Sequence, residues 1–184
     1  MKVITYIFKM TNKKEKILFA ALELFATDGF KATSTNKVAK KAGVSEGLIF
    51  RHFGNKDGLL EAILKIGEEK VKVVFSDIVL ETDPKKVISK TLDLGSKMVE
   101  TKEESDFWKL QYKIKWEIEQ YGEHKMEPLE MALTNAFKKL EYETPELEAR
   151  MLLVYLDGVA TRYFLQKNFD LSSMLETLRK KYNY

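Results

Sequence analysis

The chain has 184 residues, of which 45% are hydrophobic and 32% are charged, and its formal net charge is +3. This length corresponds to one domain or two small ones, and the composition allows both an apolar core and a soluble surface. The chain contains no cysteine and only two histidines, which excludes disulfide bonds and thiolate metal sites and leaves too few ligands for a histidine-rich site. We therefore expect no metal and no cofactor.

The charge is unevenly distributed along the chain. Residues 9–56 contain ten Lys or Arg against four Asp or Glu, a net charge of +6, whereas residues 57–184 contain twenty against twenty-four, a net charge of −4. A basic front part and an acidic rear part indicate an anionic partner for the front part alone. The alternative is a lysine-rich, solvated surface without such a partner.

Residues 1–10, MKVITYIFKM, are interpreted as an N-terminal arm, or as an upstream extension of a chain that functionally begins near Met10. Their apolar stretch is too short for a secretory signal, and no run in the sequence approaches the length of a membrane span. We therefore expect a cytoplasmic protein with no membrane partner.

Few glycines and prolines, nine and three, and no sustained strand alternation predict an all-α protein of about nine helices. Asn12 and Glu15 form a capping-box pattern at the first helix, and Pro84 and Pro145 suit the first turns of later ones. The expected helices span residues 12–29, 35–43, 45–53, 55–79, 84–100, 103–121, 127–140, 145–168 and 170–181.

The stretch STNKVAKKAGVSEGLIFRHF, residues 34–53, contains two short helices joined by a tight turn at Gly43-Val44. This pattern is typical of a helix-turn-helix, in which the second helix enters the DNA major groove. A helix of two turns is sufficient there, because its neighbours supply its stability. Ile49 and Phe53, four residues apart, are expected to form its inner face.

Residues 12–66, about a third of the chain, resemble the DNA-binding domain of the tetracycline-repressor-like (TetR/AcrR) transcriptional regulators. The resemblance rests on FATDGF, on Thr35 ahead of Val38-Ala39, on the AGVS turn, and on the HF and NKDGLL segments. The later helices match the family only in number, length and apolarity. The resemblance implies a three-helix DNA-binding domain over residues 11–56, joined by a long fourth helix to a helical ligand-binding and dimerisation domain over residues 57–184.

By position, the resemblance implies DNA contacts at the starts of the second, third and fourth helices. A glutamate such as Glu46 can accept from cytosine N4, and a leucine such as Leu48 can touch a thymine methyl group. Phe50 stands where the family usually has tyrosine, whose hydroxyl anchors a phosphate, and Arg51 can substitute for that bond. The alternative is that these side chains are ordinary helix caps and solvated charges, with Glu46 complementing the helix dipole. The expected DNA-binding residues are Ser34, Thr35, Ser45, Glu46, Gly47, Leu48, Phe50, Arg51, His52 and Lys56.

The rear part of the chain is rich in aromatic residues and methionine at helical spacing, a pattern more typical of a core than of a pocket. The resemblance nevertheless implies a cavity between the fourth and seventh helices, and such side chains suit an apolar or aromatic effector. The expected ligand-binding residues are Trp108, Tyr112, Trp116, Met131 and Tyr155.

The eighth helix, within LEARMLLVYLDGVATRYFLQKN, is apolar on most sides, which predicts that it is buried. In the resembled family this helix and the ninth form a homodimer interface, where Gly158 would permit close approach. Asp157 can pair with Arg150 or Arg162, or point to solvent at the rim. The expected interface residues are Met151, Val154, Asp157, Gly158, Thr161 and Leu175.

Together these features predict a homodimeric, ligand-responsive transcriptional regulator. It would act as a repressor that binds a palindromic operator in double-stranded DNA and releases it when a small effector binds. An activator or a ligand-independent DNA binder of the same fold is the alternative. An enzyme is disfavoured, because the sequence contains no nucleophile elbow, phosphate loop or Glu-x-x-His pair. A helical protein-interaction module would require the helix-turn-helix pattern to be accidental.

Overall fold

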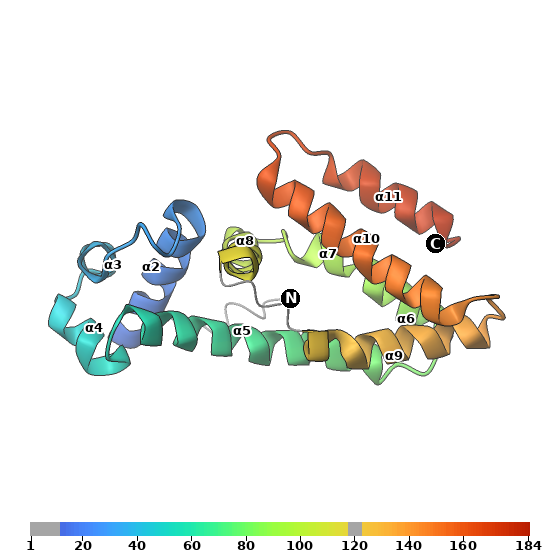
Figure 1. The fold of residues 1–184 in the computed structure, drawn as a ribbon, viewed down its shortest axis with the longest axis horizontal. Helices are drawn as coiled ribbons and strands as arrows, with labels where there is room; N and C mark the ends of the chain where they lie inside the picture. The colour runs from blue at the N-terminus through green and yellow to red at the C-terminus, as the bar shows by residue number, and fades with distance from the viewer. Residues whose placement is uncertain (1–11, 118–122) are drawn as a thin grey trace. The chain divides into compact units, whose positions relative to one another are not determined.

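The computed structural model describes residues 12–117 and 123–184, so the expected N-terminal arm and the end of the expected sixth helix lie outside the described residues. Within these ranges the protein consists of helices and turns and contains no strand, as predicted (Figure 1). The helices are α2 (Lys13–Asp28), α3 (Thr35–Ala42), α4 (Glu46–Phe53), α5 (Lys56–Val79), α6 (Pro84–Leu92), α7 (Leu94–Lys97), α8 (Lys102–Glu117), α9 (Glu123–Lys139), α10 (Pro145–Leu165) and α11 (Leu171–Lys181).

Capping side chains set the helix starts where the sequence predicts them. Asn12 Oδ1 accepts from the Glu15 amide at 2.9 Å, and the Asn12 amide donates to Glu15 Oε2 at 3.4 Å, which completes the capping box. Asp83 accepts from the first amides of α6, and Asp170 accepts from the Ser173 amide of α11. These bonds satisfy amides that have no partner inside the helix.

Two helices differ from the expectation. The segment expected as one helix over residues 84–100 is divided into α6 and α7 at Asp93, whose carboxylate forms an ion pair with Arg179 of α11. This long-range pair joins residues 86 apart, and local sequence patterns do not reveal it. Helix α9 begins at Glu123, one turn before the expected start, and continues through Pro128.

The described residues form two compact units. The first contains residues 12–71 and 101–117, and the second contains residues 72–100 and 123–184. Helix α5 contributes to both, and α8 belongs to the first unit, although it was expected in the rear domain. The functional boundary between residues 56 and 57 stays a prediction.

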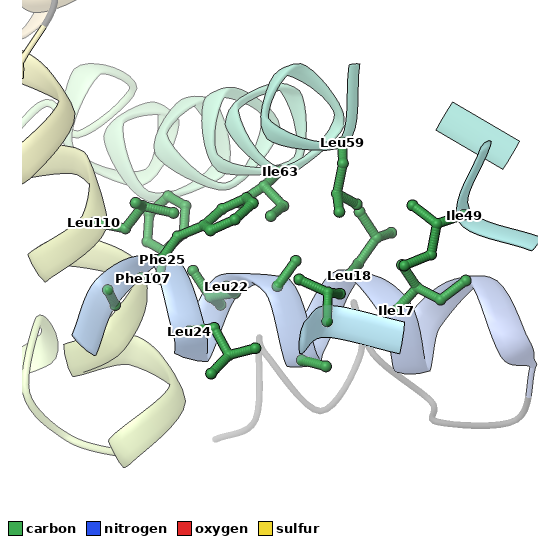
Figure 2. Close-up of a cluster of buried hydrophobic side chains, with 14 of the residues drawn as sticks. Ile17, Leu18, Leu22, Leu24, Phe25, Ile49, Leu59, Ile63, Phe107 and Leu110 are labelled. Atoms are coloured by element: carbon green, nitrogen blue, oxygen red, sulfur yellow. The ribbon is translucent and has the colours of Figure 1, made fainter. Parts of the chain in front are cut away.

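The core of the first unit surrounds α2, which packs against α3 and α8. Ile17 and Phe25 of α2 are fully buried with Ile49 of α4 and Ile63 of α5 (Figure 2). Phe107 of α8 belongs to the same cluster. Burial of aliphatic and aromatic side chains on this scale is worth about 2 kcal/mol for each fully buried residue, which holds the short helix α4 in place.

Helices α5 and α8 come unusually close at Gly67. A Cβ atom at this position would lie 2.2 Å from the Phe107 ring, so a side chain here requires the ring to move. Next to this contact, Lys70 Nζ lies 2.7 Å from Glu104 Oε1, in an ion pair that is buried on both sides. Burial lowers the pKa of Lys70, although its hydrogen bond to Glu104 opposes that shift.

The second unit has its own core, made by α6, α9, α10 and α11 with the end of α5. Leu133 and Phe137 of α9 and Leu152 of α10 are completely buried. Tyr182, after α11, packs its ring against Phe137 and donates its hydroxyl to Glu148 at 3.1 Å. Burial is the main reason why the pKa of Tyr182 is strongly raised.

Candidate nucleic-acid interface

The turn between α3 and α4 has the geometry of a helix-turn-helix. Gly43 ends α3 in the left-handed conformation, at φ 66°, and its amide donates to the Lys40 carbonyl. Residues with a side chain rarely adopt this conformation, which explains the glycine. Val44 donates to the Ala39 carbonyl at 3.0 Å, and α4 begins two residues later.

Helix α4 has one buried side and one exposed side. Ile49 is completely buried, and Phe53 and Val44 pack against the first core, as the sequence predicts. On the outer side Phe50 is 47% exposed, and Arg51 is exposed. Leu48 was expected on this outer side, but it is half-buried and packs against the core, because only part of a two-turn helix can face outward.

The expected DNA-binding residues fall into two groups by exposure. The exposed ones are Ser34, Ser45, Gly47, Phe50, Arg51 and His52. The half-buried ones are Thr35, Glu46, Leu48 and Lys56. Three of the half-buried side chains, those of Thr35, Glu46 and Lys56, hydrogen-bond to other parts of their own chain.

The two serines at the helix starts differ in their capping bonds. Ser34 Oγ accepts from the Lys37 amide at 3.2 Å, and its hydroxyl proton is not used by that bond. Ser45 is the N-cap residue of α4, but its side chain makes no capping hydrogen bond. Both hydroxyls are exposed next to helix N-termini, which are favourable positions for a phosphate.

Glu46 is held against α3 by its carboxylate. Its Oε1 accepts from the Thr35 hydroxyl at 2.5 Å, and its Oε2 accepts from the Asn36 amide nitrogen at 3.4 Å. The expectation that Glu46 presents a free carboxylate to base edges is therefore not met in this arrangement. Asn36 was not expected to take part, since nothing in the sequence pairs it with a residue ten positions away.

Lys56 was expected to hold a phosphate at the start of α5. Its ammonium instead donates to the Phe30 carbonyl at 3.0 Å and lies 4.4 Å from the centre of the Phe30 ring. The side chain thereby fixes the loop between α2 and α3. The ammonium has three N–H donors, so this bond does not exclude a contact with a phosphate.

Lys113 is a positioning residue that the sequence did not indicate. From α8 its ammonium donates to the main-chain oxygens of Ala26 and Thr27, at 2.5 and 3.1 Å. One residue on, Asp28 pairs with Lys37 of α3 at 2.6 Å, and this hydrogen bond is the main reason why the pKa of Asp28 is lowered. The end of α2 is thus tied to both α8 and α3.

The expected ligand-binding residues are divided between the two units. Trp108 and Tyr112 are partly buried in the first unit, whereas Met131 and Tyr155 belong to the second. Met131 is 66% exposed, so it does not line an enclosed cavity of its own unit, and the side chain of Trp116 lies outside the described residues. A small hollow in the second unit, with room for about one water molecule, is lined by Gly95, Met98, Val99, Leu156, Val159, Ala160, Tyr163, Phe164 and Leu171.

Helix α10, expected to be buried, exposes an apolar stripe. Met151 is 46% exposed and Val154 is 71% exposed, and no atom outside its own helix lies within 4 Å of a Cβ built at Gly158. Leu175 of α11 was also expected at the interface, but it is 6% exposed and lies against Gly95 of its own chain, which corrects that expectation. Arg150 pairs with Glu130 at 2.7 Å and not with Asp157.

The described residues contain neither a candidate membrane span nor a candidate metal site. None of the helices there combines the length and apolarity needed to cross a membrane. That part of the chain also contains no group of three or more His, Cys, Asp or Glu side chains that could hold a metal ion.

Comparison with known proteins identifies the helix-turn-helix. Residues 17–63 match the family described as bacterial regulatory proteins, tetR family. The HTH-type transcriptional regulator YvkB of Bacillus subtilis is 54% identical over 54 residues, which are 29% of this chain and 28% of that protein. The HTH-type transcriptional repressor Rv3405c of Mycobacterium tuberculosis is 40% identical over 90 residues, 46% of this chain and 45% of that protein.

The fold of the chain is similar to that of solved regulators over more than the segment 17–63. A crystal structure of a transcriptional regulator from Aquifex aeolicus VF5 superposes with a TM-score of 0.67 over 94% of this chain and 98% of that one, at 21% identity. The sequence matches to the two curated relatives, in contrast, span less than half of each relative's length. These relatives are regulators of transcription, and the helix-turn-helix of this chain lies within the segment that matches the tetR family. In its helix-turn-helix segment, residues 17–63, the chain is similar to the tetR family of bacterial regulatory proteins, and its all-helical fold is similar to that of the Aquifex aeolicus regulator.

Proposed function

We propose that the protein is a homodimeric transcriptional repressor that binds a palindromic operator and releases it when a small apolar or aromatic effector binds. The observation that carries the proposal is the outer face of α4, where Ser45, Arg51 and His52 are exposed on a helix whose other side is buried. A short helix with this division can enter the major groove while its neighbours keep it folded.

The contacts on this face divide into phosphate contacts and base contacts. The hydroxyls of Ser34 and Ser45 stand at helix N-termini, where the helix dipole favours a phosphate. Arg51 carries its charge on the outer side of α4 and would contact either a phosphate or a base edge. Phe50, 47% exposed, would place its ring against a thymine methyl group.

A stripe on α10 supports the homodimer. Its members recur at alternating steps of four and three residues, which is the spacing of a helix–helix seam. The stripe consists of Leu147, Met151, Val154, Gly158, Thr161 and Leu165, and each is at least partly exposed. Exposed apolar side chains in a continuous row indicate a protein partner, and a second α10 related by a two-fold axis would cover them.

A two-fold dimer fixes the form of its operator. Each protomer presents one α4, so the DNA site should be an inverted repeat. The centres of the two half-sites should lie roughly 34–36 Å apart or a multiple of one helical turn.

The effector is proposed to act through α8. Trp108 and Tyr112 are partly buried on this helix, and the Nε2 atom of Gln111 is buried without a hydrogen-bond partner among the described residues. A polar atom of a ligand would satisfy that group. Because α8 also carries Glu104 and Lys113, displacing it would loosen its ties to Lys70 of α5 and to the end of α2. The coupling requires the effector to bind the two arrangements with different affinities.

The proposal is tested by the salt dependence of binding to short duplex DNA, measured by fluorescence anisotropy. The parent protein should bind random duplexes with an affinity that falls as salt rises, because phosphate contacts release counterions. Arg51→Ala should weaken binding and lower the magnitude of the salt slope by about one unit if Arg51 contacts a phosphate. Lys138→Ala, which removes an exposed cation from α9, is the matched control and should not change the slope. If the parent protein shows no salt-dependent binding, the proposed function is wrong.

A reporter gene placed behind a bound site separates the repressor from the alternatives. A repressor lowers transcription until the effector is added, whereas an activator raises it. A ligand-independent DNA binder would give the same transcription with every apolar or aromatic compound tried.

A further inference from the structure

The side chain of Glu46 joins the first turns of the two helices of the helix-turn-helix. Thr35 and Glu46 are the first residues of α3 and α4, respectively, and their side chains meet at 2.5 Å. Asn36, the second residue of α3, approaches the other carboxylate oxygen at 3.4 Å. The carboxylate is therefore shared with two donors of α3.

This arrangement limits what the Thr35 hydroxyl can do on DNA. A threonine hydroxyl has one proton, and Thr35 gives that proton to Glu46. Phosphate oxygens accept hydrogen bonds only, so Thr35 cannot donate to a phosphate while it is bonded to Glu46. A phosphate contact by the Thr35 hydroxyl therefore requires the Thr35–Glu46 bond to break, whereas the Glu46 carboxylate keeps further lone pairs but is held towards α3 by its two bonds.

The same bond has a clear role in the free protein. Helix α4 has eight residues and receives no capping hydrogen bond from the Ser45 side chain. A helix of this length is not stable alone, so its first turn depends on neighbours. Glu46 also lies at the helix N-terminus, where a negative charge is favourable. Its bonds to Thr35 and Asn36 hold the first turn of α4 against the first turn of α3.

We propose that Glu46 is a positioning residue of the DNA-binding domain, which sets the place of α4 on α3 through Thr35 and does not itself select bases. The inference rests on the proposed DNA-binding function. Other residues on the outer face of α4 then select the bases. The Glu46 carboxylate keeps its hydrogen bonds to Thr35 and Asn36 while α4 lies in the major groove.

The first test needs no DNA. Amide hydrogen exchange of Leu48, Ile49 and Phe50 should be about five-fold faster in Glu46→Ala and in Thr35→Val, because each loses the same hydrogen bond. In the double variant Thr35→Val with Glu46→Ala, these amides should exchange no faster than in the single variant that exchanges faster. Thr35→Ser keeps the hydroxyl and should restore the parent rate. Unchanged exchange in the single variants, or additive effects in the double variant, would overturn the proposal.

The second test uses DNA and distinguishes positioning from base reading. Duplexes selected from a random pool by Glu46→Ala and by Glu46→Gln should carry the same motif as those selected by the parent. Glu46→Ala should bind all sequences more weakly than the parent. The affinity of Glu46→Gln should be closer to that of the parent, because its amide oxygen still accepts from Thr35. A changed preference at one base pair in each half-site would show that Glu46 reads a base and would overturn the proposal. If the parent selects no motif, the proposed function fails, and the exchange measurement alone decides the role of Glu46.

Discussion

The ammonium of Lys113, on α8, donates a hydrogen bond to the main-chain oxygen of Ala26, in the last turn of α2, across 87 positions of sequence. The last carbonyls of a helix have no partner inside it, and they form the negative end of its dipole. A cation placed there donates hydrogen bonds to these carbonyls, and its charge is favoured by the negative end of the dipole. Helix α8 is thereby fixed to the helix at the centre of the first core.

Replacing Lys113 by Met should lower the free energy of unfolding by about 1–2 kcal/mol, the usual size for a partly exposed hydrogen bond to a charged group. Lys109→Met, one turn earlier on α8, is the matched control and should change stability by less than about 0.5 kcal/mol. Urea unfolding of both variants measures the difference. Equal stability of the two variants would mean that the Lys113 bond contributes nothing to folding.

The buried ion pair of Lys70 and Glu104 predicts a loss of stability in a single variant that a second substitution restores. Lys70→Met should destabilise the protein by about 3–5 kcal/mol, because it leaves the Glu104 carboxylate buried without its cation. Adding Glu104→Leu should recover most of that loss, since two apolar side chains then replace two charges. Lys65→Met, at an exposed position of the same helix, is the control. A double variant as unstable as Lys70→Met would show that packing, and not the unpaired charge, causes the loss.

The pKa of Glu81, which lies between α5 and α6, predicts how the free energy of unfolding changes with pH in the acid range. Hydrogen bonds from Lys90 and from the amides of Asp83 and Thr82 lower the pKa of Glu81 from 4.5 to about 2. Between these values the unfolded chain binds the proton more tightly than the folded one. The contribution of Glu81 to stability is therefore present above pH 4.5 and is lost as the pH falls towards 2.

Urea midpoints measured across that pH range test this expectation. In Glu81→Gln the midpoint should fall less steeply with decreasing pH than in the parent protein. Parallel curves for the two proteins would rule out a native pKa shift at Glu81.

The apolar stripe on α10 predicts the oligomeric state. Val154 is 71% exposed, so Val154→Arg should leave the protomer folded, while it places a charge in the proposed seam. Size-exclusion chromatography with light scattering should show a dimer for the parent and a monomer for the variant. Val73→Arg, a change at a 60% exposed valine of α5, is the matched control and should stay dimeric. A folded, dimeric Val154→Arg protein would place the interface elsewhere.

Local signals in the sequence predicted the starts of the helices well. Asn12 and Asp170 cap α2 and α11 in the structure as their side-chain chemistry suggests. The turn at Gly43 and the inner face of α4 at Ile49 also follow from local pattern, since each depends on residues within one or two turns.

A helical pattern shows which face of a helix is apolar but not what covers that face. Leu175 was assigned to a partner protomer, yet α6 and α10 of its own chain pack against α11, and Leu175 lies buried against Gly95 of α7. Glu46 and Lys56 are expected at the DNA because of their positions in the resembled family, and this stays a prediction. In the structure Glu46 accepts a hydrogen bond from Thr35, eleven positions away, and Lys56 donates one to Phe30, 26 positions away. Helical periodicity does not indicate pairs that lie so far apart in the sequence.

The most direct test of the central claim is sequencing of the DNA that the purified protein selects from a pool of random duplexes. We expect an inverted repeat, with half-sites centred roughly 34–36 Å or a multiple of one helical turn apart, because two α4 helices related by a two-fold axis bind together. Selection of a single, unrepeated half-site would contradict the dimeric operator complex. No enrichment at all would contradict sequence-specific DNA binding.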